Sequence, residues 1–83
     1  MLVLVTETVG NPDFRQDNTL PLAHAPSIRQ PVADQDEAVA AFSAWRDRHD
    51  VGCGNLRRAD IMDGNTVIAR LSYNGRVWPV VEA

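Results

Sequence analysis

Apolar side chains recur every three to four positions between residues 35 and 50, which is the spacing of one face of an α-helix. The stripe consists of Ala38, Ala41, Phe42, Trp45 and His49. Asp34 and Glu37 precede it with the spacing of a capping box, and Gly52 follows as a stop signal. The pattern predicts an amphipathic helix over residues 35–50.

Four shorter segments have the composition of β-strands, rich in apolar and β-branched residues. They are residues 2–8, 57–62, 66–73 and 76–81. Asp63-Gly64-Asn65 and Asn74-Gly75 separate the last three segments, and both stretches supply residues that tolerate the positive φ of hairpin turns. We therefore expect the C-terminal third to be a meander of three antiparallel strands.

Residues 10–31 show no periodic pattern and contain prolines at positions 12, 21, 26 and 31. We expect a long irregular loop here, in which Ser27 to Gln30 has the potential to pair briefly as an edge strand. Pro79 lacks a backbone donor, so the last strand is expected to lie at a sheet edge or to be bulged.

These elements predict an α+β fold in which one amphipathic helix packs on a small antiparallel sheet of about four strands. The expected order is strand, loop, helix, and then three strands. With 83 residues and 45% hydrophobic content, the chain suffices for one modest core, so we expect a single domain over residues 1–83. The pattern leaves open whether the first strand is central or at an edge.

The composition favours a soluble protein of the bacterial cytoplasm. Cys53 is the only cysteine, so no internal disulfide can form, and a secreted domain of this size usually needs several. The apolar start at residues 1–5 is too short for a signal peptide, and no stretch approaches the length of a membrane span.

No group of residues has the pattern of a catalytic or metal site. The histidines and the cysteine, which are the residues that most often bind zinc, are His24, His49 and Cys53. They do not form the two pairs of ligands that a zinc site usually needs. The serines have no nucleophile-elbow motif, and the helix carboxylates are expected to be solvated and ionised. We therefore expect a protein that is not an enzyme, holds no metal or cofactor, and works through its surface.

Two surfaces are candidates for binding a partner. The first is an acidic helix face made by Asp36, Glu37, Asp47 and Asp50. An ordinary solvated helix surface explains the same residues, because surface helices are usually charged.

The second candidate surface is the side of the sheet that faces away from the helix. In the middle strand, the side chains expected to face the helix are Val67, Ala69, Leu71 and Tyr73. The alternating side chains expected to face outward are Ile68, Arg70 and Ser72. Together with its neighbours, this side offers a nucleic-acid-binding set of Arg58, Arg70, Arg76 and Trp78. The alternative, which the pattern favours, is that Trp78 packs partly under the N-terminal loop and that the arginines pair with Asp60 and Glu82.

From the helix onward, the sequence resembles small proteins of phages, plasmids and integrative elements of Gram-negative bacteria. The resemblance rests on the stretch from Ala41 to Gly52, on Asn55, and above all on Ala69-Arg70-Leu71-Ser72-Tyr73-Asn74-Gly75-Arg76-Val77-Trp78. It covers about half of the chain. In size and layout the chain is also similar to several anti-CRISPR proteins, which inhibit by occupying a site on a Cas protein and have no catalytic residues.

This resemblance implies an inhibitor of bacterial host defence. The expected function is that of an anti-CRISPR that binds a type I Cascade complex through the acidic helix face and blocks target DNA. The alternatives are a small nucleic-acid-binding accessory protein of a mobile element that uses its sheet face, and a subunit or antitoxin that is stable only in complex. The expected partner is a protein, a Cas protein or the Cascade complex; neither a membrane partner nor direct binding of nucleic acid is expected.

Overall fold

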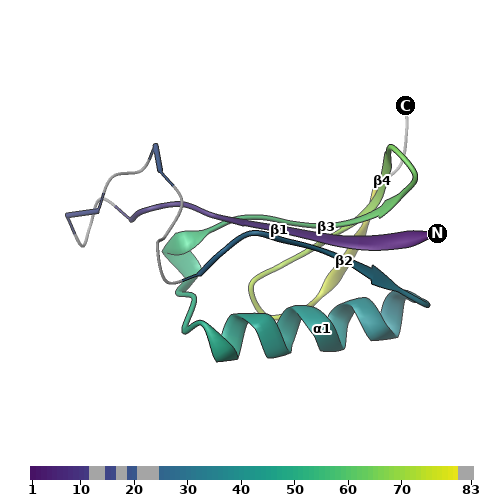
Figure 1. Cartoon of the computed structure of the whole chain (residues 1–83), viewed down its shortest axis with the longest axis horizontal. Helices are drawn as coiled ribbons and strands as arrows, with labels where there is room; N and C mark the ends of the chain where they lie inside the picture. The colour runs from purple at the N-terminus through teal and green to yellow at the C-terminus, as the bar shows by residue number, and fades with distance from the viewer. Residues whose placement is uncertain (12–14, 17–18, 21–24, 81–83) are drawn as a thin grey trace.

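A five-stranded antiparallel sheet carries a single helix on one of its faces (Figure 1). The computed structural model describes residues 1–11, 15–16, 19–20 and 25–80. The strands are β1 (Leu2–Thr8), β2 (Ile28–Val32), β3 (Leu56–Asp63), β4 (Thr66–Leu71) and β5 (Val77–Pro79), the helix is α1 (Gln35–Arg48), and a short 3-10 turn, η2 (Cys53–Asn55), precedes β3. The strand order across the sheet is β2-β1-β3-β4-β5.

The predicted α+β class is confirmed, and the sheet has one strand more than the four expected. The additional strand is β2, which occupies the end of the region predicted as a loop and includes most of the stretch from Ser27 to Gln30. It pairs with β1 from Thr6↔Ile28 to Leu2↔Val32. This pairing places β1 inside the sheet, between β2 and β3, which settles the position that the sequence left open.

Both edge strands contain a proline, Pro31 in β2 and Pro79 in β5. The prediction that Pro79 lies in an edge strand is confirmed. Because proline has no N–H to donate, these residues weaken the edges as templates for pairing with another chain.

The helix begins as predicted and ends two residues earlier than predicted. Glu37 N donates to Asp34 Oδ1 at 2.8 Å, and the Glu37 carboxylate accepts from Ala33 N at 2.9 Å, so both side chains cap the first turn. At the other end, Asp50 takes a positive φ of 51°, and Val51 N donates to Arg46 O at 3.0 Å. Asp50 thus occupies the left-handed position that glycine usually fills, and Gly52 is not needed as the stop.

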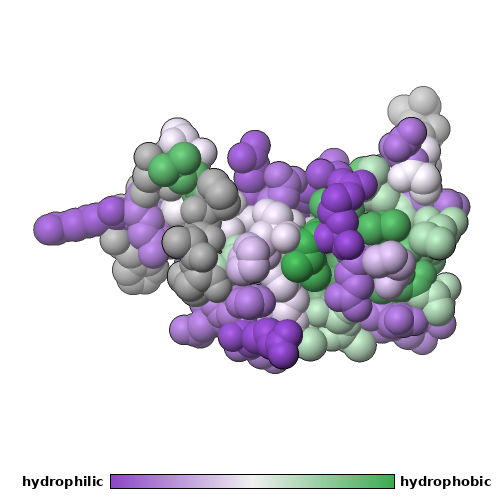
Figure 2. Space-filling model, in the orientation of Figure 1, coloured by the Kyte–Doolittle hydropathy of each residue, from purple (hydrophilic) through white to green (hydrophobic). Residues whose placement is uncertain are grey.

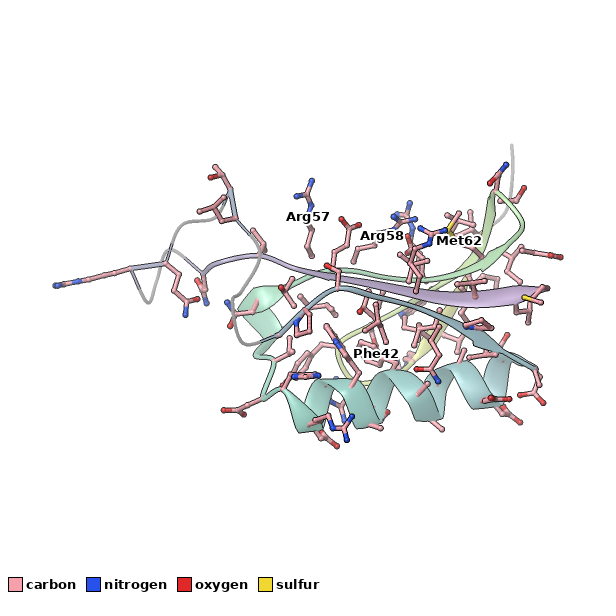
Figure 3. All side chains as sticks on the ribbon, viewed as in Figure 1. Phe42, Arg57, Arg58 and Met62 are labelled. Atoms are coloured by element: carbon pink, nitrogen blue, oxygen red, sulfur yellow. The ribbon has the colours of Figure 1, made fainter. Side chains whose placement is uncertain are left out.

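The core lies between α1 and the covered face of the sheet. Phe42 is fully buried at its centre, together with Leu4 and Ile61 from the two central strands. Phe42 points from α1 toward the sheet, whereas Arg57, Arg58 and Met62 project from the opposite side (Figure 3). Figure 2 shows hydrophilic side chains on both the helix side and the sheet side of the molecule, with apolar surface between them.

Two glycines in the C-terminal hairpins have positive φ, as the turn sequences predicted. Gly64, with φ of +60°, is the first of the two loop residues that join β3 to β4. The first residue of such a two-residue hairpin loop needs a positive φ. Gly75, with φ of +84°, donates from its N–H to Ser72 O at 2.8 Å in the turn before β5. This turn lies against α1, since Arg46 Nη1 donates to Tyr73 O at 2.7 Å.

The segment between β1 and β2 is fixed to the rest of the protein at several of its described residues. Trp45 Nε1 donates to Pro26 O at 3.0 Å, and Thr8 Oγ1 donates to Ala25 O at 3.0 Å. Asn55 Nδ2 donates to Val9 O at 3.0 Å. Four residues named in the sequence analysis lie outside the described part of the chain: Pro12, Pro21, His24 and Glu82.

Candidate binding surface

The face of the sheet opposite α1 carries a row of side chains, one from each strand. In order across the sheet, the register aligns Arg29, Val5, Asp60, Arg70 and Trp78. Their neighbours Leu4, Ile61 and Ala69 belong to the core under α1. Because successive side chains of a strand point to opposite faces, the row lies on the side that the helix does not cover.

A β-bulge adds a second basic pair to this side. Glu7 pairs with Arg58, but the next residue of β1, Thr8, pairs with Leu56, so Arg57 is the extra residue of β3. A bulge breaks the alternation of side chains. As a result, Arg57 and Arg58 both project away from the helix (Figure 3).

We call the resulting surface the arginine face. It comprises Arg29, Arg57, Arg58, Arg70, Arg76 and Trp78, with the carboxylates of Glu7 and Asp60. Five arginines against two carboxylates give this face a local positive excess, although the whole chain has a net charge of −3. The charge of the chain is therefore distributed unevenly, with the positive part on the uncovered side of the sheet.

Arg58 is held by an ion-pair network and is not a free ligand group. Its Nε donates to Asp60, its Nη1 contacts Glu7 at 3.2 Å, and its Nη2 contacts the sulfur of Met62 at 3.5 Å. Hydrogen bonding to Asp60 raises the pKa of the Arg58 guanidinium above its usual value, with a smaller contribution from Glu7. Arg58 thus pairs with both carboxylates and stabilises the surface that carries the other arginines.

The remaining arginines of the face are available to a partner. Within the described residues, no ion pair involves Arg29 or Arg57, and both side chains are exposed. The Arg70 side chain is 69% exposed and reaches Asp60 only at 3.7 Å. The Arg76 guanidinium lies 5.9 Å from the centre of the Trp78 ring.

Trp78 is the exposed aromatic group of this surface. It is 56% exposed, so more than half of its surface is accessible to a partner. The expected partial packing of Trp78 under the N-terminal loop involves residues that lie partly outside the described part of the chain. The expected pairing of the arginines with Asp60 is found, since Arg58 and Arg70 both contact it. Ile68 and Val80 are partly exposed beside Trp78 and give the β4–β5 edge an apolar margin.

The four residues of the predicted acidic helix face are all exposed, but they do not gather into one cluster. Glu37 is engaged in capping the helix, and Asp47 pairs with Arg46 at 3.1 Å. Asp36 and Asp50 lie at opposite ends of α1, which at 1.5 Å per residue are roughly 20 Å apart. The structure therefore offers separate carboxylates here instead of a compact acidic patch.

Sequence reasoning had missed two residues of the arginine face, Arg29 and Arg57. Arg29 lies in the stretch that was expected to pair only briefly as an edge strand, and the register with β1 is what assigns its side chain to this face. Arg57 reaches this face through a bulge that leaves no mark in the local sequence. The adjacent arginines Arg57 and Arg58 were the only hint in the sequence of this second basic pair. Regular alternation along a strand would have placed one of the two side chains on the core side of the sheet.

Within the described part of the chain, no group of three or more His, Cys, Asp or Glu side chains is placed to hold a metal ion. No helix there is long and apolar enough to cross a membrane.

No family model, curated protein or solved structure matches this chain.

Proposed function

We propose that this protein is a non-enzymatic binding protein that holds single-stranded nucleic acid on its arginine face. The observation that carries the proposal is the cross-strand pair of Arg70 and Trp78, which sets an exposed cation beside an exposed aromatic ring. Proteins that bind single strands combine these two groups, because arginine pairs with phosphate and the aromatic ring stacks on a base.

A single strand fits this surface better than a duplex. In a duplex the bases are stacked on one another, so the ring of Trp78 has no base face to contact. A strand with unstacked bases can lie across the sheet with its phosphates near the arginines and a base on Trp78. The site of action in this proposal is the cytoplasm of a bacterium that carries a mobile element.

Replacing Trp78 tests the proposal. Base stacking on an aromatic side chain contributes about 1–3 kcal/mol, so Trp78→Ala should raise the Kd for a fluorescein-labelled oligothymidylate roughly 5- to 150-fold. Leu20→Ala is the matched control, because Leu20 is 57% exposed, similar to Trp78, and is not one of the residues of the arginine face. Trp78→Phe should bind with intermediate affinity, and a thermal melt of each variant checks that it is folded.

If the Trp78→Ala variant is folded and its Kd is unchanged, no base of the strand stacks on Trp78. A wild-type protein that does not bind the oligonucleotide would end the proposal itself.

A second candidate function follows from the resemblance to mobile-element proteins. In it, the protein is an anti-CRISPR that binds a type I Cascade complex, and the exposed carboxylates of Asp36, Asp47 and Asp50 contact basic Cascade surfaces. Reversing these three charges to lysine should abolish retention of Cascade subunits on the tagged protein. Retention of Cascade by the charge-reversed variant would exclude the acidic contact.

A further inference from the structure

A hollow opens on the arginine face where two neighbouring strands part. β3 and β4 pair from Asp63↔Thr66 as far as Asp60↔Arg70, and the pairing ends there. Beyond this point β3 continues along β1, while β4 continues along β5. The space between them, which we call the β3–β4 notch, has a volume of about 560 Å³, within the range of small-ligand sites.

The rim of the notch is basic, and both of its carboxylates are already paired with Arg58. Arg57, Arg58 and Arg70 line it, together with Glu7 and Asp60. Arg58 is bound to both carboxylates, and only the long 3.7 Å contact joins Arg70 to Asp60. Arg57 and Arg70 therefore have most of their N–H donors available, and the notch has a surplus of one positive charge.

The notch is continuous with the place where Trp78 is exposed. A second hollow of about 510 Å³ is lined by Arg76 and Trp78, and Ser72 lines both hollows. Arg70, on the rim of the first hollow, is also the direct cross-strand neighbour of Trp78. Adjacent strands lie about 5 Å apart, so the backbone positions that carry Arg70 and Trp78 lie within one strand spacing of each other.

We propose that the β3–β4 notch is a phosphate subsite, in which Arg57 and Arg70 hold one backbone phosphate of a single strand whose neighbouring base stacks on Trp78. The planar guanidinium groups offer paired N–H donors that match the oxygens of a phosphate. This inference rests on the proposed function and specifies where on the arginine face the strand is held.

The charge of the notch favours a strand phosphate over a free nucleotide. A backbone phosphodiester carries one negative charge, which matches the surplus of one positive charge. A terminal phosphate monoester carries about 1.5 to 2 negative charges at neutral pH, which the notch would leave partly uncompensated. We therefore expect thymidine monophosphate to compete poorly with an oligothymidylate.

The test compares arginines that carry equal charge at different places on the same face. Arg57→Ala and Arg70→Ala remove the notch contacts, whereas Arg29→Ala removes one charge from β2, at the opposite edge of the sheet. Hydrogen bonds to charged groups contribute about 1.5–3 kcal/mol, so each notch variant should raise the Kd for the labelled oligothymidylate roughly 10- to 150-fold. Arg29→Ala should raise it less than about threefold, as expected for a distant charge.

The outcomes separate the subsite from the proposed function. Equal weakening by Arg29→Ala and Arg57→Ala would show that the face binds only through its general charge, which overturns the subsite and leaves strand binding intact. Thymidine monophosphate would also overturn the subsite, in favour of a free-nucleotide site, if it competes when its concentration equals that of the nucleotide units in the oligothymidylate. Absence of wild-type binding would overturn both. Because Arg57 is exposed and unpaired within the described residues, its replacement should leave the melting temperature unchanged.

Discussion

Binding of a single strand to the arginine face should weaken steeply as the salt concentration rises. Each phosphate that an arginine neutralises releases condensed counterions, and this release favours binding less when the bulk salt is higher. The structure limits how many phosphates can be involved, because Arg58 is committed to Glu7 and Asp60. The arginines that remain near the notch and Trp78 are Arg57, Arg70 and Arg76, since Arg29 lies on the edge strand β2.

These side chains set the size of the salt effect. For single strands, the slope of log Kobs against log salt is about −0.7 for each neutralised phosphate. Arg57 and Arg70 share one phosphate in the proposed subsite and Arg76 can pair with a second, so two neutralised phosphates predict a slope of about −1.4. Raising the salt from 50 to 200 mM, a fourfold change, should then lower the affinity about sevenfold.

The assay is a set of fluorescence anisotropy titrations of the labelled oligothymidylate at four or more salt concentrations. Arg57→Ala should make the slope shallower by up to about 0.7, because the phosphate of the notch loses one of its two arginine partners. Arg48→Ala is the control of equal charge, since Arg48 is an exposed residue of α1, on the other side of the molecule. A wild-type slope shallower than −1, or an equal change of slope in both variants, would refute the assignment of the phosphate contacts to this face.

Two further predictions concern the stability of the scaffold. Phe42 is fully buried, so Phe42→Ala should lower the free energy of unfolding by about 3–5 kcal/mol in urea denaturation, and a loss under 1 kcal/mol would contradict the described core. Arg46 hydrogen-bonds to Tyr73 O at 2.7 Å and lies against the rings of Phe42 and Tyr73, so Arg46→Ala should cost about 1–3 kcal/mol by the same measurement. The exposed Arg48→Ala should change stability by less than about 0.5 kcal/mol, and a similar loss in both variants would contradict the role of Arg46.

The parts of the fold that were predictable from the sequence have local causes. The capping pair of Asp34 and Glu37 defines the start of α1 within four residues of chain. Gly64 and Gly75 mark the two C-terminal turns because each supplies a positive φ at its own position. The alternation along β4 also placed Ala69 and Leu71 in the core.

The parts that were not predictable depend on pairing between distant segments. β2 has little strand character of its own and contains Pro31, so its place in the sheet follows from its register with β1. The end of α1 was placed two residues too late because Asp50, and not a glycine, takes the left-handed conformation.

The candidate site was predicted only in part for the same reason. Arg70 and Trp78 could be placed on the outward side by alternation, and the structure makes them direct neighbours. The role of Arg58 could not be foreseen, because its pairing with Glu7 depends on the contact between β1 and β3. The bulge that brings Arg57 to the surface arises from the same contact.

The most direct test of the account compares binding of the wild-type protein to a single-stranded oligonucleotide and to the duplex of the same sequence at low salt. The account predicts saturable binding of the single strand and at least tenfold weaker binding of the duplex, because only unstacked bases can reach the ring of Trp78. Equal affinity for the two, or no saturable binding of the single strand, would contradict it.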